Sequence, residues 1–148
     1  MSHSPRNTTS DPRLAISLTA ALGGFAIFAV GARPDWLGLA TTPEVGFLQI
    51  LFMTVGMGIL SAAGYAAFRL LWQGQPLSIP AQIGARLIAT GYVVVAASTM
   101  ADILGLGSQT WPRNAHFGPI QSYGVLIGEL IIGIGLLLLY PRGRTPTS

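Results

Sequence analysis

The sequence contains no cysteine and no lysine, because all eight basic residues are arginine. Without cysteine the chain has no disulfide bond, thiol nucleophile or zinc–thiolate site. Without lysine it has no Schiff-base amine and no phosphate-binding lysine of the P-loop type. A metal site is not expected either, because His116 is the only histidine near the loop carboxylates. We therefore predict a protein that is not an enzyme and binds no cofactor or metal.

Charge is also scarce, since charged residues make up 9% of the 148 residues and apolar residues 51%. A soluble domain averages about a quarter charged residues, so this chain lacks the groups to cover a surface in water. The arginines are scattered rather than gathered along one face, so no nucleic-acid partner is expected. The partner that this composition favours is the lipid bilayer.

Four long apolar segments predict membrane-spanning helices. They cover about residues 14–32, 45–72, 81–106 and 119–140. Each is long enough for an apolar layer that takes about 20 helical residues to cross. The apolar runs are continuous rather than alternating, which favours helices over the strands of a barrel. The predicted fold class is an all-α, polytopic four-transmembrane-helix bundle over residues 13–141, with polar tails at 1–12 and 142–148. The first tail is expected to be disordered.

The arginines predict the orientation. Six fall on one side of the predicted bundle and two on the other: Arg6, Arg13, Arg69, Arg86, Arg142 and Arg144 against Arg33 and Arg113. By the positive-inside rule both tails are cytoplasmic, in a cell membrane that we expect to be a bacterial inner membrane. A cleaved signal peptide ending at Val30-Gly31-Ala32 is the rival interpretation of the first segment. However, residues 14–32 are long for the core of a signal.

The two halves of the sequence share three short matches in the same order. These are Arg13-Leu14 with Arg86-Leu87, Asp35-Trp36-Leu37-Gly38-Leu39 with Asp102-Ile103-Leu104-Gly105-Leu106, and Gly46-x-x-Gln49 plus Gly56 with Gly118-x-x-Gln121 plus Gly128. They predict two similar helical hairpins of the same orientation, as in parallel transporter repeats. The distance from arginine to aspartate is 22 positions in the first half and 16 in the second, which counts against a simple duplication. The simpler interpretation is a hairpin repeated for packing, without transport.

Glu129 is the most informative single residue, because it lies ten positions into the fourth predicted helix. A charged carboxylate near the middle of a bilayer costs several kcal/mol, about 2.5–3.5 on insertion scales for comparable groups. Apolar surroundings favour the neutral acid, since neither Arg86 nor Arg113 is expected to reach this depth. One hypothesis is a proton or cation relay. The alternatives are a structural hydrogen bond to a neighbouring helix and a contact with another subunit.

The candidate neighbours of Glu129 follow from helical phase. Ser122 lies on the same stripe of the fourth helix, and Ser98 and Asp102 lie on one stripe of the third. Such stripes more often hold helices together than line a path. Two pairs of small residues are candidate packing sites, within the chain or in a homodimer: Gly58-x-x-x-Ala62 and Gly124-x-x-x-Gly128.

The leading functional hypothesis is a non-catalytic membrane protein, an accessory or self-associating subunit of a homo-oligomer or a larger membrane complex. Short loops and the lack of a catalytic set motivate it. The alternative is a small proton-coupled transporter that uses the carboxyl group of Glu129.

Overall fold

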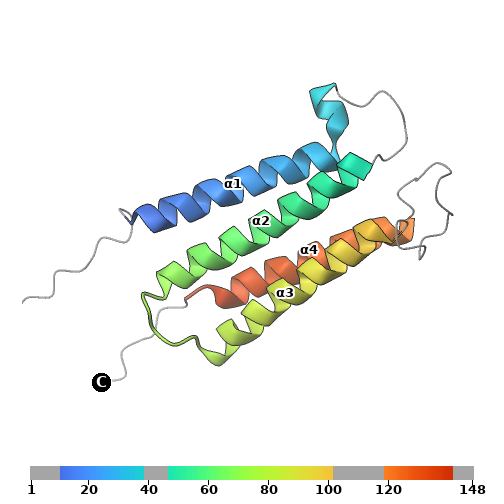
Figure 1. The fold of residues 1–148 in the computed structure, drawn as a ribbon. Helices are drawn as coiled ribbons and strands as arrows, with labels where there is room; N and C mark the ends of the chain where they lie inside the picture. Colours follow the sequence, from blue (N-terminus) through green and yellow to red (C-terminus); the bar gives the residue numbers. More distant parts are fainter. Residues whose placement is uncertain (1–10, 39–46, 102–118, 142–148) are drawn as a thin grey trace, which may run out of the picture.

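The computed structural model describes residues 11–38, 47–101 and 119–141. In these ranges the chain forms α1 (Pro12–Ala32), the short 3-10 helix η2 (Pro34–Leu37), α2 (Phe47–Leu71), α3 (Ile79–Met100) and α4 (Pro119–Leu139), and no strand. Figure 1 shows the four α-helices side by side, with α1 beginning and α4 ending at the same end of the bundle. We call this the proximal end and the opposite one the distal end. The predicted all-α bundle of four helices is confirmed.

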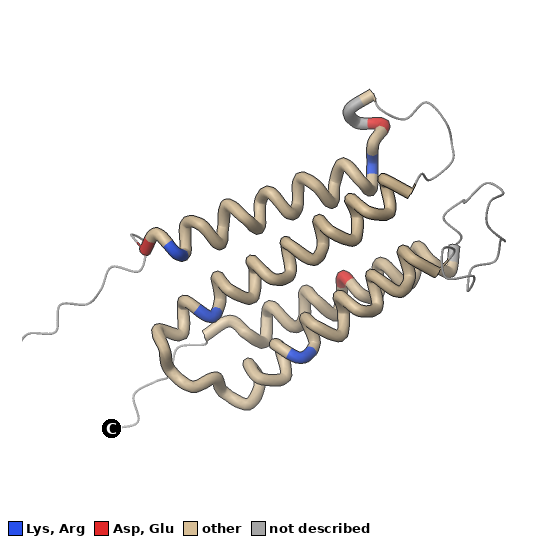
Figure 2. The backbone as a smooth tube through the Cα atoms, in the orientation of Figure 1, with Lys and Arg blue, Asp and Glu red and all other residues tan. Residues whose placement is uncertain are grey.

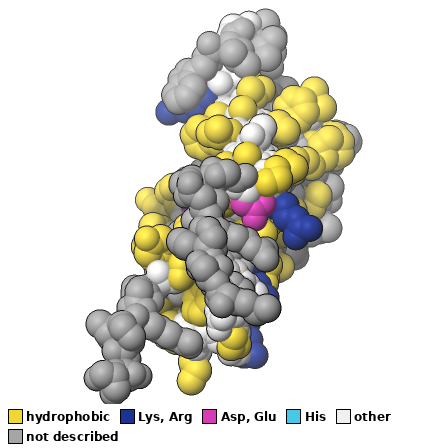
Figure 3. All heavy atoms as spheres, turned by 90° about the vertical axis from the view of Figure 1, so that its left-hand side faces the viewer, with side chains coloured by type: hydrophobic (Ala, Val, Ile, Leu, Met, Phe, Trp, Pro, Cys, Tyr) yellow, Lys and Arg dark blue, Asp and Glu magenta, His cyan; other side chains and the backbone are white. Residues whose placement is uncertain are grey.

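Each α-helix is long and apolar enough to cross a membrane. The outside of the bundle is also apolar: Leu22, Ile120 and Leu137 are 71%, 83% and 69% exposed. Figure 3 shows hydrophobic side chains spread over much of the face seen from the proximal end. An apolar exterior of this extent is unfavourable in water and favourable in lipid. Four helices of this length and composition indicate a membrane protein.

Capping residues set where two of the helices begin. The Asp11 carboxylate accepts a hydrogen bond from the backbone N–H of Arg13 at 3.0 Å, and Ser78 Oγ accepts one from Ala81 at 3.4 Å. A proline follows each cap within the first turn, where its missing N–H leaves no donor unpaired. Both helices consequently start two residues before the positions predicted from the apolar runs.

The first hairpin, α1 with α2, is held by direct contact between helix backbones. A methyl group added at Gly24 would lie 2.9 Å from the Gly56 carbonyl oxygen, and one added at Gly56 would lie 2.8 Å from that of Gly24. Gly31, seven residues along α1, makes the same kind of approach to Met53. Only glycine permits contacts this close, as is common between helices in membranes.

The second hairpin, α3 with α4, is built in the same way. Gly91 meets Gly128 and Gly84 meets Gly135, each pair with the carbonyl oxygen of one facing the α-carbon of the other. The larger side chains of the seam are also spaced by seven residues and form most of the buried core: Ala81, Ile88 and Val95 from α3, with Val125, Ile132 and Leu139 from α4. A seven-residue spacing is the period of a left-handed pair of helices.

The glycine contacts of the two hairpins can be matched by a constant offset in the sequence for each pair of helices. Gly24 and Gly91 are 67 positions apart, as are Asp35 and Asp102, whereas Gly56 and Gly128 are 72 apart, as are Gln49 and Gln121. Two of the three sequence matches fit this register. The match of Arg13 with Arg86 does not fit, because the 67-residue offset between Gly24 and Gly91 pairs Arg13 with position 80.

Polar contacts between described residues help to hold the two hairpins together. Thr54 of α2 and Thr99 of α3 share a buried hydrogen bond of 2.9 Å, and each hydroxyl also contacts a carbonyl of its own helix. At the proximal end the indole of Trp72 donates to the Leu139 carbonyl at 2.9 Å. Near it Phe68 packs edge-on against Tyr140, with ring centroids 6.1 Å apart. The packing between the two hairpins is looser than the packing between the two helices of each hairpin.

The glycine seam predicts a contrast between two adjacent residues. Gly24→Ala places a methyl group against the backbone of α2, so it should destabilise the protein by about 1–3 kcal/mol. Gly23→Ala meets nothing within 4 Å and should be neutral or slightly stabilising, because alanine favours helix. Thermal unfolding in detergent micelles measures both. Equal melting temperatures for the two variants would show that the close approach contributes nothing.

Candidate functional site

A cavity of about 520 Å³ lies in the distal half of the bundle, between the first hairpin and α4. It is lined by Phe28, Ala32, Arg33, Gln49, Met53, Ser122, Val125, Leu126 and Glu129. Its walls are mostly apolar, but four of these side chains carry polar groups. A largely apolar cavity with a few convergent polar groups is the usual form of a binding site.

Glu129 gives the cavity its carboxyl group. It is the eleventh of the 21 residues of α4, and Figure 2 shows its acidic position midway along the helix. The neighbouring Gly128 and Ile132 are buried in the seam with α3, whereas Glu129 is half-buried and borders the cavity. The carboxyl group therefore lies at the middle of an apolar helix without being enclosed by the chain's own core.

The other polar groups come from both sides of the cavity. Ser122 lies two turns before Glu129 on α4, and Gln49 lies near the start of α2. Arg33 is the C-cap of α1, where its backbone N–H donates to the Ala29 carbonyl at 2.8 Å. Its guanidinium is 3.8 Å from Asp35, and both side chains are more than half exposed, so this ion pair contributes little stability.

The structure separates the residues that the sequence placed together. Ser122 and Glu129 line the cavity, but Ser98 instead faces Gly124 inside the α3–α4 seam, and Asp102 lies outside the described residues. The buried polar contact made by α3 comes from Thr99, one residue later. Gly128 also lies in the seam, whereas Gly58 and Ala62 border an open groove on α2.

Two cavity residues, Arg33 and Gln49, were not predicted. In the sequence, Arg33 indicates only orientation, and Arg86 and Arg113 are the candidate cationic partners of Glu129, neither of them expected to reach its depth. Arg33 borders the same cavity because the distal end of α1 lines it on one side and α4 on the other. Gln49 belongs to a motif that occurs in both halves of the sequence. The sequence does not indicate which neighbouring helix this side of α2 faces.

The chemistry available in the cavity is hydrogen bonding and charge pairing. A carboxyl, an amide, a hydroxyl and a guanidinium can hold a small cationic or hydrogen-bonding group. Among the residues described, no three histidine, aspartate or glutamate side chains lie close enough to hold a metal ion. The cavity is thus suited to binding or to helix association.

The polar lining predicts that water enters the cavity from the distal end. The chain has no cysteine, so single cysteines can be introduced at Leu126, which lines the cavity, and at the adjacent Ile127, which does not. Both side chains are 53% exposed, so exposure alone predicts equal labelling. We expect a membrane-impermeant maleimide to label Leu126→Cys at least tenfold faster, because the thiolate forms only where water reaches it. Equal rates would mean that lipid or a neighbouring protein helix, rather than water, fills the cavity.

Comparisons with protein-family models, curated proteins and solved structures gave no match to this chain. The function proposed below rests on the geometry of the bundle and the chemistry of its side chains.

Proposed function

We propose that this chain is a non-catalytic subunit of a membrane complex, formed with copies of itself or as an accessory to a larger assembly. The observation that carries the proposal is the position of Glu129, half-buried at the middle of a helix of membrane-spanning length. A carboxyl group at this depth is unfavourable when it faces lipid. A helix of another subunit that covers the cavity removes that cost and supplies a hydrogen-bond partner.

The proposal includes an orientation in the membrane. Figure 2 shows basic residues close to the proximal ends of α1, α2 and α3, where Arg13, Arg69 and Arg86 lie, and one near the distal end, Arg33. A basic proximal end supports a cytoplasmic location for it under the positive-inside rule. With that orientation the Glu129 cavity opens towards the outer face of a bacterial inner membrane.

We also propose that the two hairpins arose by duplication. The support is the shared register: Gly24 and Gly56 of the first seam correspond to Gly91 and Gly128 of the second, and Gln49 corresponds to Gln121. Two hairpins held by the same pattern of glycine contacts suit a scaffold, because the outward faces of the helices are left free to bind other molecules.

The test is to change the carboxyl group in two ways. Glu129→Leu removes both the hydrogen bond and the cost of exposure to lipid, so it should weaken assembly by on the order of tenfold, as expected for about 1–2 kcal/mol. Glu129→Gln keeps a donor and should retain the assembly. Crosslinking in native membranes, followed by mass determination in mild detergent, measures the assembled fraction.

Asp35→Asn serves as the matched control, because it removes an acidic charge from the exposed distal end. It should leave the assembled fraction unchanged. If the unmodified protein is a lone monomer in the membrane, or if Glu129→Leu assembles as well as the parent chain, the subunit proposal is wrong.

A small proton-coupled transporter is the second candidate, and the polar cavity with Arg33, Gln49 and Glu129 is what favours it. The same variants separate the two functions. In a transporter, Glu129→Gln should abolish pH-driven uptake of small organic cations by proteoliposomes while leaving the fold intact. Unchanged uptake in that variant would exclude the transporter.

A further inference from the structure

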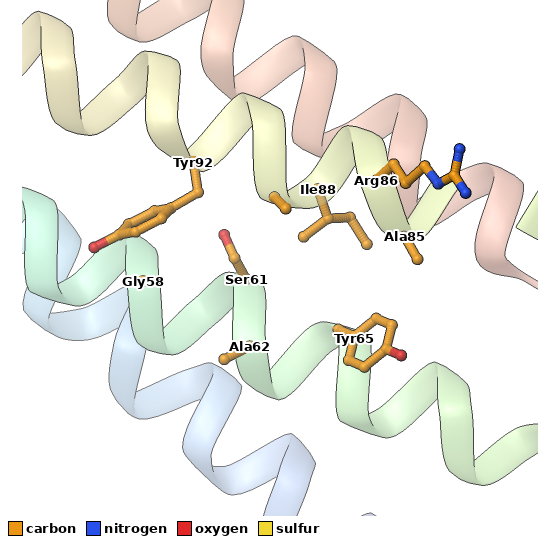
Figure 4. A pocket seen from close by; sticks show the side chains of 9 residues that line it. Gly58, Ser61, Ala62, Tyr65, Ala85, Arg86, Ile88 and Tyr92 are labelled. Atoms are coloured by element: carbon orange, nitrogen blue, oxygen red, sulfur yellow. The ribbon is translucent and has the colours of Figure 1, made fainter. Parts of the chain in front are cut away.

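A second cavity of about 550 Å³ lies between α2 and α3, in the half of the bundle near the proximal end. Small residues on both helices make the space: Gly58 and Ala62 on α2, and Ala85 and Ala89 on α3 (Figure 4). The exposed side chains of Ala62 and Ala89 leave the cavity open sideways, so it is a groove on the outside of the bundle. Tyr92, which touches Gly58, closes its inner end.

This groove contains a polar group that the chain does not satisfy. Ser61 is 4% exposed, and its buried hydroxyl has no hydrogen-bond partner. Figure 4 shows the Ser61 side chain directed from α2 towards α3, between Tyr92 on one side and Tyr65 on the other. An unpaired buried hydroxyl costs about 1–3 kcal/mol, so an acceptor that enters the groove and meets Ser61 is favoured.

One arginine lines the groove, and a second lies one helical turn beyond it on α2. Arg86 is among its lining residues, and Figure 4 shows its side chain extending along α3 past Ala85. Arg69 continues the same face of α2, one turn beyond Tyr65, and its buried Nη1 atom has no hydrogen-bond partner. Within the described part of the chain, Ser61 Oγ and Arg69 Nη1 are the two buried side-chain polar atoms left unpaired, and both lie on this face.

We propose that this groove binds one anionic glycerophospholipid from the leaflet at the proximal end. Its phosphate lies between Arg69 and Arg86, and one acyl chain lies along Ala62 and Ala89. Arg86 is seven residues after Ile79, about 10 Å along the axis, and Ser61 is ten residues before Leu71, about 15 Å. Ser61 is therefore the deeper group, as the ester carbonyl of a lipid is deeper than its phosphate.

The charges and the openings of the groove select this occupant. Two guanidinium groups favour an anionic over a zwitterionic headgroup, and basic sites between membrane helices commonly hold such headgroups. The sideways opening admits an acyl chain from the surrounding lipid. The site is separate from the Glu129 cavity, so lipid binding does not depend on the proposed assembly.

The experiment measures lipid retained by the purified chain after exchange into nanodiscs of phosphatidylcholine with or without phosphatidylglycerol. Native mass spectrometry should show one phosphatidylglycerol bound per chain, preferred at least tenfold over phosphatidylcholine. Arg69→Gln with Arg86→Gln should remove that preference. Arg13→Gln, which lowers the charge of the same end on α1, should keep it.

A groove-filling variant tests where the acyl chain lies. Ala89→Leu places bulk in the groove and should reduce retention at least tenfold, whereas Ala97→Leu, also exposed on α3 but outside the groove, should not. Retention by Ala89→Leu, or an equal loss with Arg13→Gln, would overturn the proposal. So would an unmodified chain that shows no preference for phosphatidylglycerol, or a protein helix crosslinked to Ala89→Cys in native membranes.

Discussion

Direct backbone contact at glycines holds each hairpin together, and the rest of the bundle depends on it. In lipid the burial of apolar side chains does not by itself drive helices together, because acyl chains solvate them equally well. Association relies on the number of close atomic contacts and on weak contacts between Cα–H groups and carbonyl oxygens. Gly24 with Gly56, and Gly91 with Gly128, bring the paired helices close enough for both. The seven-residue spacing of further glycines extends the contact along each seam.

The interface between the hairpins follows a different principle. It is tied by the Thr54–Thr99 hydrogen bond and by the indole of Trp72, and it lacks a glycine seam. Larger side chains such as Met53 and Met57 fill its centre, and they leave unfilled space on either side. The distal space is the cavity of Glu129, and the proximal space is the groove of Ser61. Both candidate sites therefore follow from one feature: the two hairpins pack loosely against each other, although the helices within each hairpin pack tightly.

The architecture could be predicted from the sequence because it depends on apolar length, and four uninterrupted runs leave few alternatives. α1 and α3 start two residues before the approximate positions expected from the apolar runs, because Asp11-Pro12 and Ser78 with Pro80 carry capping signals that an apolar count ignores. The match of Arg13 with Arg86 does not follow the register of the glycine contacts, and the internal repeat stays a prediction. The glycines give that register most directly, since they mark where the backbones of paired helices meet.

The site was harder to predict, because helical phase shows which residues share a face but not which faces meet. Phase placed Ser122 with Glu129 correctly on α4, and it gave no means of bringing Arg33 and Gln49 from another hairpin to the same cavity. Ser98 and Thr99 differ by one position, and only the packing of α3 on α2 decides which hydroxyl crosses between helices. Which residues meet depends on how two helix surfaces pack together, and the sequence pattern of a single helix does not indicate this.

The positions of the polar groups link the two proposals. In hydrocarbon an unpaired polar group is costly, so a helix seam that excludes both water and lipid must be free of them. Glu129 and Ser61 each border a space between the hairpins, and Arg69 lies one helical turn beyond Tyr65 on α2. None of the three is among the close contacts of the glycine seams. In the described part of the chain, the two buried side-chain polar atoms without a partner, Ser61 Oγ and Arg69 Nη1, therefore lie outside the glycine seams. A protein helix against the carboxyl group of Glu129, and a phospholipid against Ser61 and the two arginines, are the occupants that we propose for these two spaces.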